Sequence, residues 1–262
     1  MEREPVTGKY FNFSEVLDYG WSVMKANFWF FVGLGFVLLI FAYIPTVIDR
    51  LARVLYLPRP VFVLLNIATN ILGWVISIVL GIGLIKIALS FCDERKPPIG
   101  TLFDAWDCLW RYVGAGILYA LIMLAACIPF ALAAVLHAQI YLPFLFMLIG
   151  LVFAVRFAIQ FGLCFYFVVD KDLGPVQALK ASSRTTMGAK WQLLGFGILC
   201  VLINLLGLLC LIVGIFATYP MVIVANALVY RQLLAQTPEL AEFGIAAPIA
   251  APNIEPSPNK QE

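Results

Sequence analysis

Long apolar runs separated by short polar segments form the main hydrophobic pattern of this chain. A bilayer core about 30 Å thick requires about 20 mostly apolar helical residues, so each run of that length predicts a membrane-spanning helix. Five runs reach this length, and the last is long enough for two spans. The six predicted spans cover residues 27–48, 66–91, 113–136, 141–169, 191–206 and 211–234.

The last apolar run holds 39 residues, 191–229, without Lys, Arg, Asp or Glu. A single helix of this length would extend about 58 Å, roughly twice the thickness of the hydrocarbon core. The run therefore predicts a helical hairpin. Glycine favours turns, so we expect the turn at Gly207 or Gly214.

A polar or amphipathic segment precedes the first, third and fifth spans, at residues 13–26, 101–111 and 176–190. Each predicts a helix that lies at the inner membrane interface rather than crossing it. Two interpretations of these helices stay open. They form a surface that binds anionic lipid or phosphate, or they have no ligand and lie at the interface because their long basic side chains extend to water. In the first segment the apolar residues recur at helical spacing: Phe13, Val16, Leu17, Gly20, Trp21 and Met24.

The motif W-x-x-x-G-x-G occurs three times at a constant spacing of 81 residues. The preference of Trp for interfaces and of Gly for membrane helices does not set a common period, so we interpret the motif as an internal repeat. Its members are Trp29, Gly33 and Gly35, then Trp110, Gly114 and Gly116, then Trp191, Gly195 and Gly197.

Each copy of the motif opens an odd-numbered span, so each repeat begins and ends on the same side of the membrane. The pattern predicts three parallel helical-hairpin repeats, at about 13–96, 97–173 and 174–234, around a pseudo-threefold axis along the membrane normal. Each hairpin is preceded by its cytoplasmic interfacial helix. The predicted fold class is an all-α integral membrane protein with six transmembrane helices.

Composition agrees with this class. Hydrophobic residues make up 63% of the chain and charged residues 12%, with a mean hydropathy of +0.98, whereas soluble domains carry about 25% charged residues. The formal net charge is only +2, which does not suit a nucleic-acid-binding protein.

The basic residues predict the orientation, because Lys and Arg are retained in cytoplasmic segments close to the spans. Of the 17 Lys and Arg residues, 13 fall on the side of the two termini, and only Arg50, Arg53 and Arg59 fall on the other side. We therefore expect both termini in the cytoplasm and a location in the bacterial inner membrane. Residues 1–26 do not resemble a cleavable signal, and 235–262 are predicted to form a disordered tail.

Arg156 is the only charged residue well inside a predicted span, which makes it the first candidate for a functional role. No Asp or Glu lies inside any span, so the candidate partners are amides, backbone carbonyls or a lipid phosphate. A kink near Gly162 would instead let Arg156 reach the interface, which is a structural role. The amide candidates are Gln160, Asn70, Asn204 and Asn226, of which the asparagines commonly form interhelical hydrogen bonds.

Other chemistry finds little support in the sequence. The six cysteines and the single histidine, His137, show no metal-ligand spacing, and no metalloprotease or nucleotide-binding motif is present. Carboxylates at mid-membrane, which are usual in proton- or sodium-coupled transporters, are absent. We therefore expect neither a cofactor nor an enzymatic activity.

Three stretches carry a resemblance to known families: FSEVLDYGWSVMKANFWFFVGL, VRFAIQFGLCFYFVVDKDLGPVQALKASSRTTMGAKWQLLGF and NLLGLLCLIVGIFATYPMVIVANALVYRQL. The chain resembles poorly characterised prokaryotic six-span membrane proteins, a set that includes the membrane domain of glycerophosphoryl diester phosphodiesterase. The resemblance covers most of residues 13–234 and implies that Arg156 and the polar run 178–191 are recurrent positions. It does not imply hydrolase activity, because no soluble catalytic domain follows the last span.

The sequence thus favours a non-enzymatic membrane protein, a scaffold or a module that binds membrane lipid or a membrane-protein partner. The alternative is a transporter or channel for a small or amphipathic solute, with a path along the pseudo-threefold axis. A third interpretation, an intramembrane lipid enzyme, requires a polar constellation that these residues do not supply.

Overall fold

The computed structural model describes residues 9–56, 58–126, 128, 141–209, 214–237 and 240, and within these ranges the chain is helical without any β-strand. The predicted all-α fold is therefore confirmed. The elements are α1 (Phe13–Ala26), α2 (Phe28–Val54), α3 (Arg59–Cys92), the 3-10 helix η1 (Ile99–Phe103), α4 (Leu109–Ala126), α6 (Tyr141–Phe161), α7 (Cys164–Lys171), α8 (Pro175–Thr186), α9 (Lys190–Leu209) and α10 (Ile215–Ala235).

Four helical segments are long and apolar enough to cross a membrane, as expected of an integral membrane protein: Phe28–Val54, Arg59–Cys92, Met147–Lys171 and Lys190–Leu209. The third of these runs from α6 across a short interruption at Gly162 and Leu163 into α7. The other two predicted spans fall on α4 and α10. The apolar part of α4 is shorter than these four segments. The third predicted span continues past Ala126, and most of that continuation lies outside the described residues. Six spans therefore stay a prediction.

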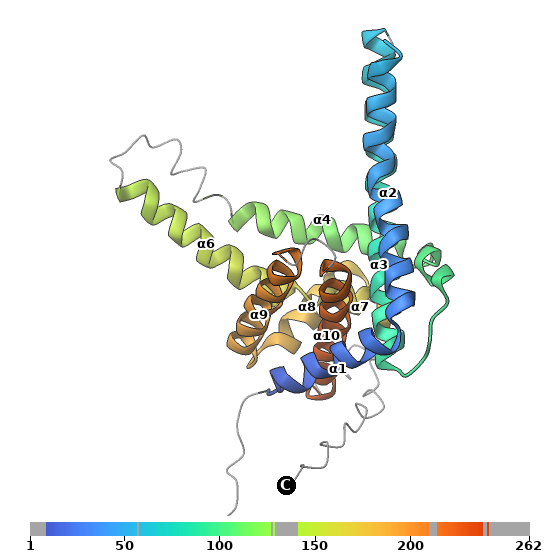
Figure 1. Cartoon of the computed structure of the whole chain (residues 1–262). Coiled ribbons are helices and arrows are strands. Elements are labelled where there is room, and N and C mark those ends of the chain that lie inside the picture. Colours follow the sequence, from blue (N-terminus) through green and yellow to red (C-terminus); the bar gives the residue numbers. More distant parts are fainter. Residues whose placement is uncertain are drawn as a thin grey trace, which may run out of the picture.

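Helices α2 and α3 form a long hairpin that extends beyond the other helices (Figure 1). Their close approach depends on Gly73, since a Cβ atom there would lie 2.9 Å from Cγ of Pro45 in α2. Toward the far end of the hairpin, Asn66 donates a hydrogen bond to Asp49 (3.0 Å), which also forms an ion pair with Arg53 (2.6 Å). The hydrogen bond joins α3 to α2, whereas the ion pair lies within α2 and holds the Asp49 carboxylate in place.

Helix α10 is the centre of the packed body (Figure 1), in contact with α1, α2, α3, α8 and α9. Helix α1 crosses it at Gly20, where a Cβ atom would lie 2.7 Å from the carbonyl oxygen of Met221. Most of the side chains of α10 are buried: Met221, Val222, Val224, Ala225, Ala227, Leu228, Val229, Tyr230, Leu233 and Leu234.

The segments predicted to be interfacial helices differ from one another. Residues 13–26 form α1 with the predicted limits, and Asn12 caps it by accepting a hydrogen bond from the backbone N–H of Ser14. The prediction of a helix over 101–111 is wrong: η1 and a turn at 106–108 stand there instead. The third segment forms α8, which ends at Thr186, four residues before the predicted end at 190.

The glycines of the predicted α9–α10 hairpin also separate into two roles. Gly214 caps α10 at its N-terminus and so lies at the turn, while Gly207 lies inside α9, which continues to Leu209. A turn at Gly207 is therefore wrong. This glycine instead faces Thr218 of α10, whose side chain leaves no space for a Cβ atom.

The three motif tryptophans share one local setting. Trp29, Trp110 and Trp191 are each the second residue of a helix (α2, α4 and α9), and their exposed fractions are 82%, 82% and 81%. The α4–α6 pair extends to a different side of the body from the α2–α3 hairpin (Figure 1). The threefold arrangement of the repeats stays a prediction.

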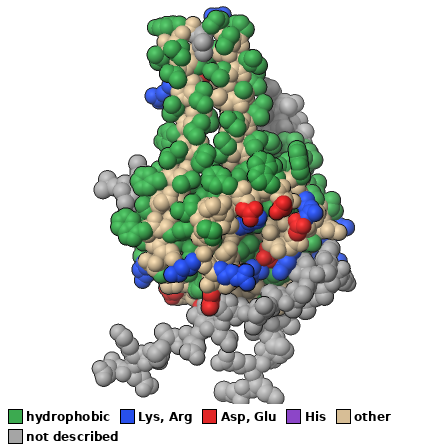
Figure 2. Space-filling model, turned by 90° about the vertical axis from the view of Figure 1, so that its right-hand side faces the viewer, with side chains coloured by type: hydrophobic (Ala, Val, Ile, Leu, Met, Phe, Trp, Pro, Cys, Tyr) green, Lys and Arg blue, Asp and Glu red, His purple; other side chains and the backbone are tan. Residues whose placement is uncertain are grey.

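Charged side chains are unevenly distributed over the surface. On the face seen in Figure 2, most Lys, Arg, Asp and Glu side chains lie in a belt across one end of the body, while the α2–α3 hairpin above it is largely hydrophobic. Such a division matches a membrane-embedded region and a region at the water interface.

Candidate functional site: an apolar cavity and its charged end

A cavity of about 530 Å³ lies between α2, α3 and α10. Its wall is almost entirely apolar, with Ser77, Tyr219 and backbone atoms as the polar contributors. Volumes of about 300–1,000 Å³ are typical of small-molecule sites. The lining residues are Phe31, Leu34, Gly35, Leu38, Leu39, Phe41, Ala42, Ile76, Ser77, Leu80, Gly81, Leu84, Ile87, Ala88, Phe216, Tyr219, Pro220, Ile223 and Val224.

Aromatic rings pack together beside the cavity, near the C-terminal end of α3. The ring of Phe91 lies 5.3 Å from that of Phe31 and 5.7 Å from that of Phe30, measured between centroids. Met24 of α1 is buried in the same cluster. Met24 and Phe91 thus pack against the part of the cavity wall that Phe31 and Ile87 form.

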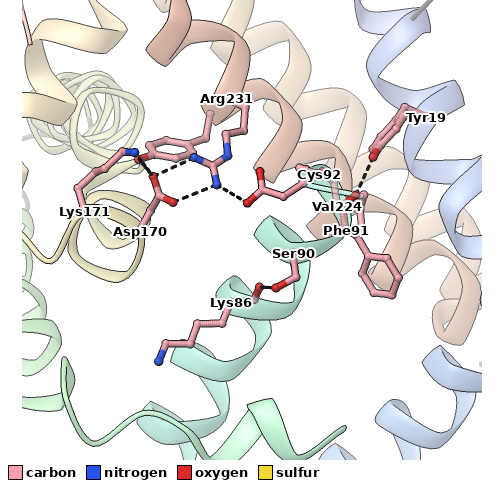
Figure 3. Close-up of polar contacts among 11 residues, drawn as sticks. Tyr19, Lys86, Ser90, Phe91, Cys92, Asp170, Lys171, Val224 and Arg231 are labelled. Carbon is pink, nitrogen blue, oxygen red and sulfur yellow. Dashed lines mark hydrogen bonds and ion pairs between the residues drawn. The ribbon is translucent and has the colours of Figure 1, made fainter. Parts of the chain in front are cut away.

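Next to these rings in the chain, at the C-terminus of α3, a cluster of ion pairs joins the ends of three helices (Figure 3). Arg231 of α10 donates hydrogen bonds to Asp170 of α7 (3.1 Å) and to Asp93 at the C-terminus of α3 (2.9 Å). The Lys171 ammonium lies 3.3 Å from the Asp170 carboxylate, and the hydroxyl of Tyr230 donates a hydrogen bond to the same carboxylate at 3.0 Å.

The ion cluster is neutral and mostly buried. Two carboxylates balance Arg231 and Lys171, and the side chains of Arg231 and Asp170 are only 14% and 11% exposed. Opposite charges that satisfy one another leave little capacity to bind a further ion. The cluster thus fixes the ends of α3 and α10, the two cavity walls that reach it, against α7.

Further hydrogen bonds reinforce the same end of α3. The Tyr19 hydroxyl of α1 donates to the carbonyl oxygen of Phe91 (2.9 Å), and the Cys92 thiol lies 3.9 Å from the carbonyl oxygen of Val224 (Figure 3). Burial raises the pKa of Tyr19 to about 12, with smaller contributions from Cys92, Glu94 and Asp93. The phenol therefore stays protonated and able to donate at neutral pH.

Lys86 and Ser90 also appear in Figure 3 but stand apart from the ion cluster. Ser90 donates to the carbonyl of Lys86 within α3 (2.8 Å), and the Lys86 ammonium contacts Asp104 beyond η1. In the described ranges, no group of three His, Cys, Asp or Glu side chains could hold a metal ion.

The predicted polar site is distributed over four helices. Arg156 and Gln160 lie one turn apart on α6, and Gln160 donates to the hydroxyl of Ser183 in α8 (2.8 Å). Arg156 is exposed and forms no hydrogen bond or ion pair with any residue that the structure describes.

The three asparagines lie elsewhere. Asn70 is exposed on α3 and donates to Asn66, and Asn226 donates to the carbonyl of Val222 within α10 (2.8 Å). The side-chain oxygen of Asn204 in α9 is buried without a hydrogen-bond partner. Within the described chain, no hydrogen bond joins any two of the five candidates, and none of the five lines the cavity.

No sequence motif marks the ion cluster, because its members are far apart in the chain: Arg231 is 61 residues from Asp170 and 138 from Asp93. One signal was available. Each of the three residues stands at or just beyond the end of an apolar run, so all were expected on the same side of the membrane.

Comparisons of the chain with protein-family models, with curated proteins and with solved structures found no match.

Proposed function

We propose that this chain is a non-enzymatic membrane protein that binds a membrane lipid, with an acyl chain held in the cavity between α2, α3 and α10. The cavity is the observation that carries this proposal. Its walls include two helices long and apolar enough to span a membrane, so a hydrocarbon chain reaches it from the bilayer without crossing water.

The physical gain from binding is one of packing. An acyl chain is already in an apolar environment in the bilayer, so it gains little hydrophobic free energy on entering the cavity. An unfilled cavity, however, lacks dispersion contacts along its walls. A chain that fills it restores these contacts, and the fixed shape of the walls gives preference to chains that fit.

The positions of the polar side chains favour lipid binding over transport of a polar solute. A path for a polar solute requires polar side chains along it, and the predicted candidates lie outside the cavity. The ion cluster at the ends of α3, α7 and α10 is neutral and joins these helices. We place the charged belt, and with it both termini, on the cytoplasmic face of the bacterial inner membrane, in line with the positive-inside rule.

Native mass spectrometry of the protein extracted in mild detergent tests this proposal. Ala42 lines the cavity and is exposed toward it, so Ala42→Trp should fill part of the volume and reduce the number of retained lipids. Ala68→Trp is the matched control, because Ala68 is exposed on α3 away from the cavity. Equal lipid retention in wild type and Ala42→Trp would contradict the proposal.

A further inference from the structure

A second site stands on α6 and α8, on the other side of α10 from the α2–α3 hairpin (Figure 1). Its first member is Arg156, an exposed cation inside the apolar segment Met147–Lys171. A charge on a membrane helix is costly unless it is paired or reaches the interface. The described residues offer Arg156 no hydrogen bond or ion pair, so its guanidinium donors are available to a group outside the described chain.

The interruption between α6 and α7 brings a polar helix to this place. The helix breaks at Gly162 and Leu163, and the carbonyl oxygen of Gln160 accepts hydrogen bonds from the hydroxyls of Ser182 (2.9 Å) and Thr186 (3.4 Å). With the Gln160 amide bound to Ser183, α8 is fixed against α6 about one turn, or roughly 6 Å along the axis, from Arg156.

Helix α8 adds a second cation beside this contact. Its inner face is buried through small side chains such as Ala178, Ala181 and Thr185, whereas Lys180 is exposed. Lys180 stands three residues before Ser183, so it shares the face that meets Gln160. Lys180, like Arg156, has no hydrogen bond or ion pair to a described residue.

Neither helix carries a negative charge. The sequences of α6 and α8 contain no Asp or Glu, which distinguishes this pair from the ion cluster of Arg231. The guanidinium group presents its donors in a planar fork that matches phosphate oxygens, and an ammonium group adds a compact positive charge. An anion with phosphate oxygens is therefore the ligand that this surface suits.

We propose that Arg156 and Lys180, each about one turn from the Gln160–Ser183 contact on its own helix, bind a phosphate group, in the first place that of an anionic phospholipid headgroup. The site uses helices other than those of the cavity, so it holds a different lipid, and either proposal stands if the other fails.

The test measures binding of phosphatidylglycerol and of phosphatidylcholine to the full chain by native mass spectrometry in mild detergent. Wild type should bind phosphatidylglycerol more tightly than phosphatidylcholine. Arg156→Gln should weaken the binding of phosphatidylglycerol about tenfold or more, as expected for loss of charge-assisted hydrogen bonds. Arg156→Lys and Lys180→Gln should have smaller effects. Arg50→Gln, an exposed arginine at the far end of α2, should have none.

Titration with inorganic phosphate distinguishes the source of the ligand. Displacement of phosphatidylglycerol from wild type, but not from Arg156→Gln, by millimolar phosphate would show that the site takes free phosphate as well. No displacement would assign it to the lipid headgroup. Equal affinity of wild type, Arg156→Gln and Lys180→Gln for phosphatidylglycerol would overturn the proposal. If Arg156→Gln does not fold, Arg156→Lys and Lys180→Gln decide by the same comparison.

Discussion

Helices α6 and α10 are both the second helix of a predicted hairpin repeat and both have 21 residues, yet they occupy opposite environments. Helix α6 exposes most of its apolar side chains, whereas α10 is buried among five other helices. The buried helix is the more polar of the two, since it carries Asn226, Tyr230, Arg231 and Gln232.

This reversal follows from the solvent. In a bilayer, apolar side chains gain little by facing protein instead of lipid, whereas polar side chains need partners that lipid does not supply. The two arginines illustrate the rule. Arg231 of α10 is held by two carboxylates, and Arg156 of α6 faces outward without a described partner.

The largest expected effect is on stability, from removal of Arg231. In Arg231→Ala the largely buried Asp170 loses the closer of its two cations and keeps only Lys171, at 3.3 Å. Breaking a buried ion pair in this way costs about 3–5 kcal/mol. Arg53→Ala is the control, because the Arg53 side chain is 68% exposed and surface pairs contribute about 0–1 kcal/mol. Thermal unfolding in detergent measures both. Similar midpoints for the two variants would mean that the ion cluster does not stabilise the body.

Replacing an alanine by phenylalanine should destabilise the protein in the buried helix α10 but not in the exposed helix α6. Ala225 of α10 has no exposed surface, so Ala225→Phe should lower the free energy of unfolding by about 1–3 kcal/mol through overpacking. Ala158 of α6 is exposed, and Ala158→Phe should change it by about 0.5 kcal/mol or less. The same thermal measurement applies. A large loss in Ala158→Phe would show that α6 is covered in the membrane, for example by a second copy of the chain.

The sequence did not predict that α10 is buried and α6 exposed. The apolar runs predicted the helices, and the limits of α1 were correct, because helix length and amphipathic spacing are local properties. Which apolar face contacts lipid and which contacts protein is not local, because both environments accept the same side chains. The cavity could not be predicted for the same reason. It forms where α2, α3 and α10 pack together, and no sequence motif marks such a contact between helices.

The repeat motif gives a further, smaller test, because its glycines are alike in sequence and different in contacts. A Cβ atom on Gly114 would lie 2.8 Å from the Pro175 ring of α8, while one on Gly33 would meet nothing within 4 Å. Gly33→Ala should therefore gain up to about 1 kcal/mol from helix propensity, and Gly114→Ala should lose stability. Equal changes in the two variants, read from unfolding midpoints, would favour equivalent repeats over the asymmetric packing.

The smallest expected effect concerns the hydrogen bond from Tyr19 to the end of α3. Tyr19→Phe removes this bond and should cost about 1 kcal/mol at neutral pH. Because the pKa of Tyr19 is raised from its ordinary value of 10.0 to about 12, the phenol adds its full stabilisation below pH 10 and loses it as the pH rises toward 12. The difference in unfolding midpoint between wild type and Tyr19→Phe should be constant from pH 7 to about pH 9 and then shrink. A difference that stays constant up to about pH 11 would mean that folding does not raise the pKa of Tyr19, and would place the phenol in water rather than against the buried end of α3.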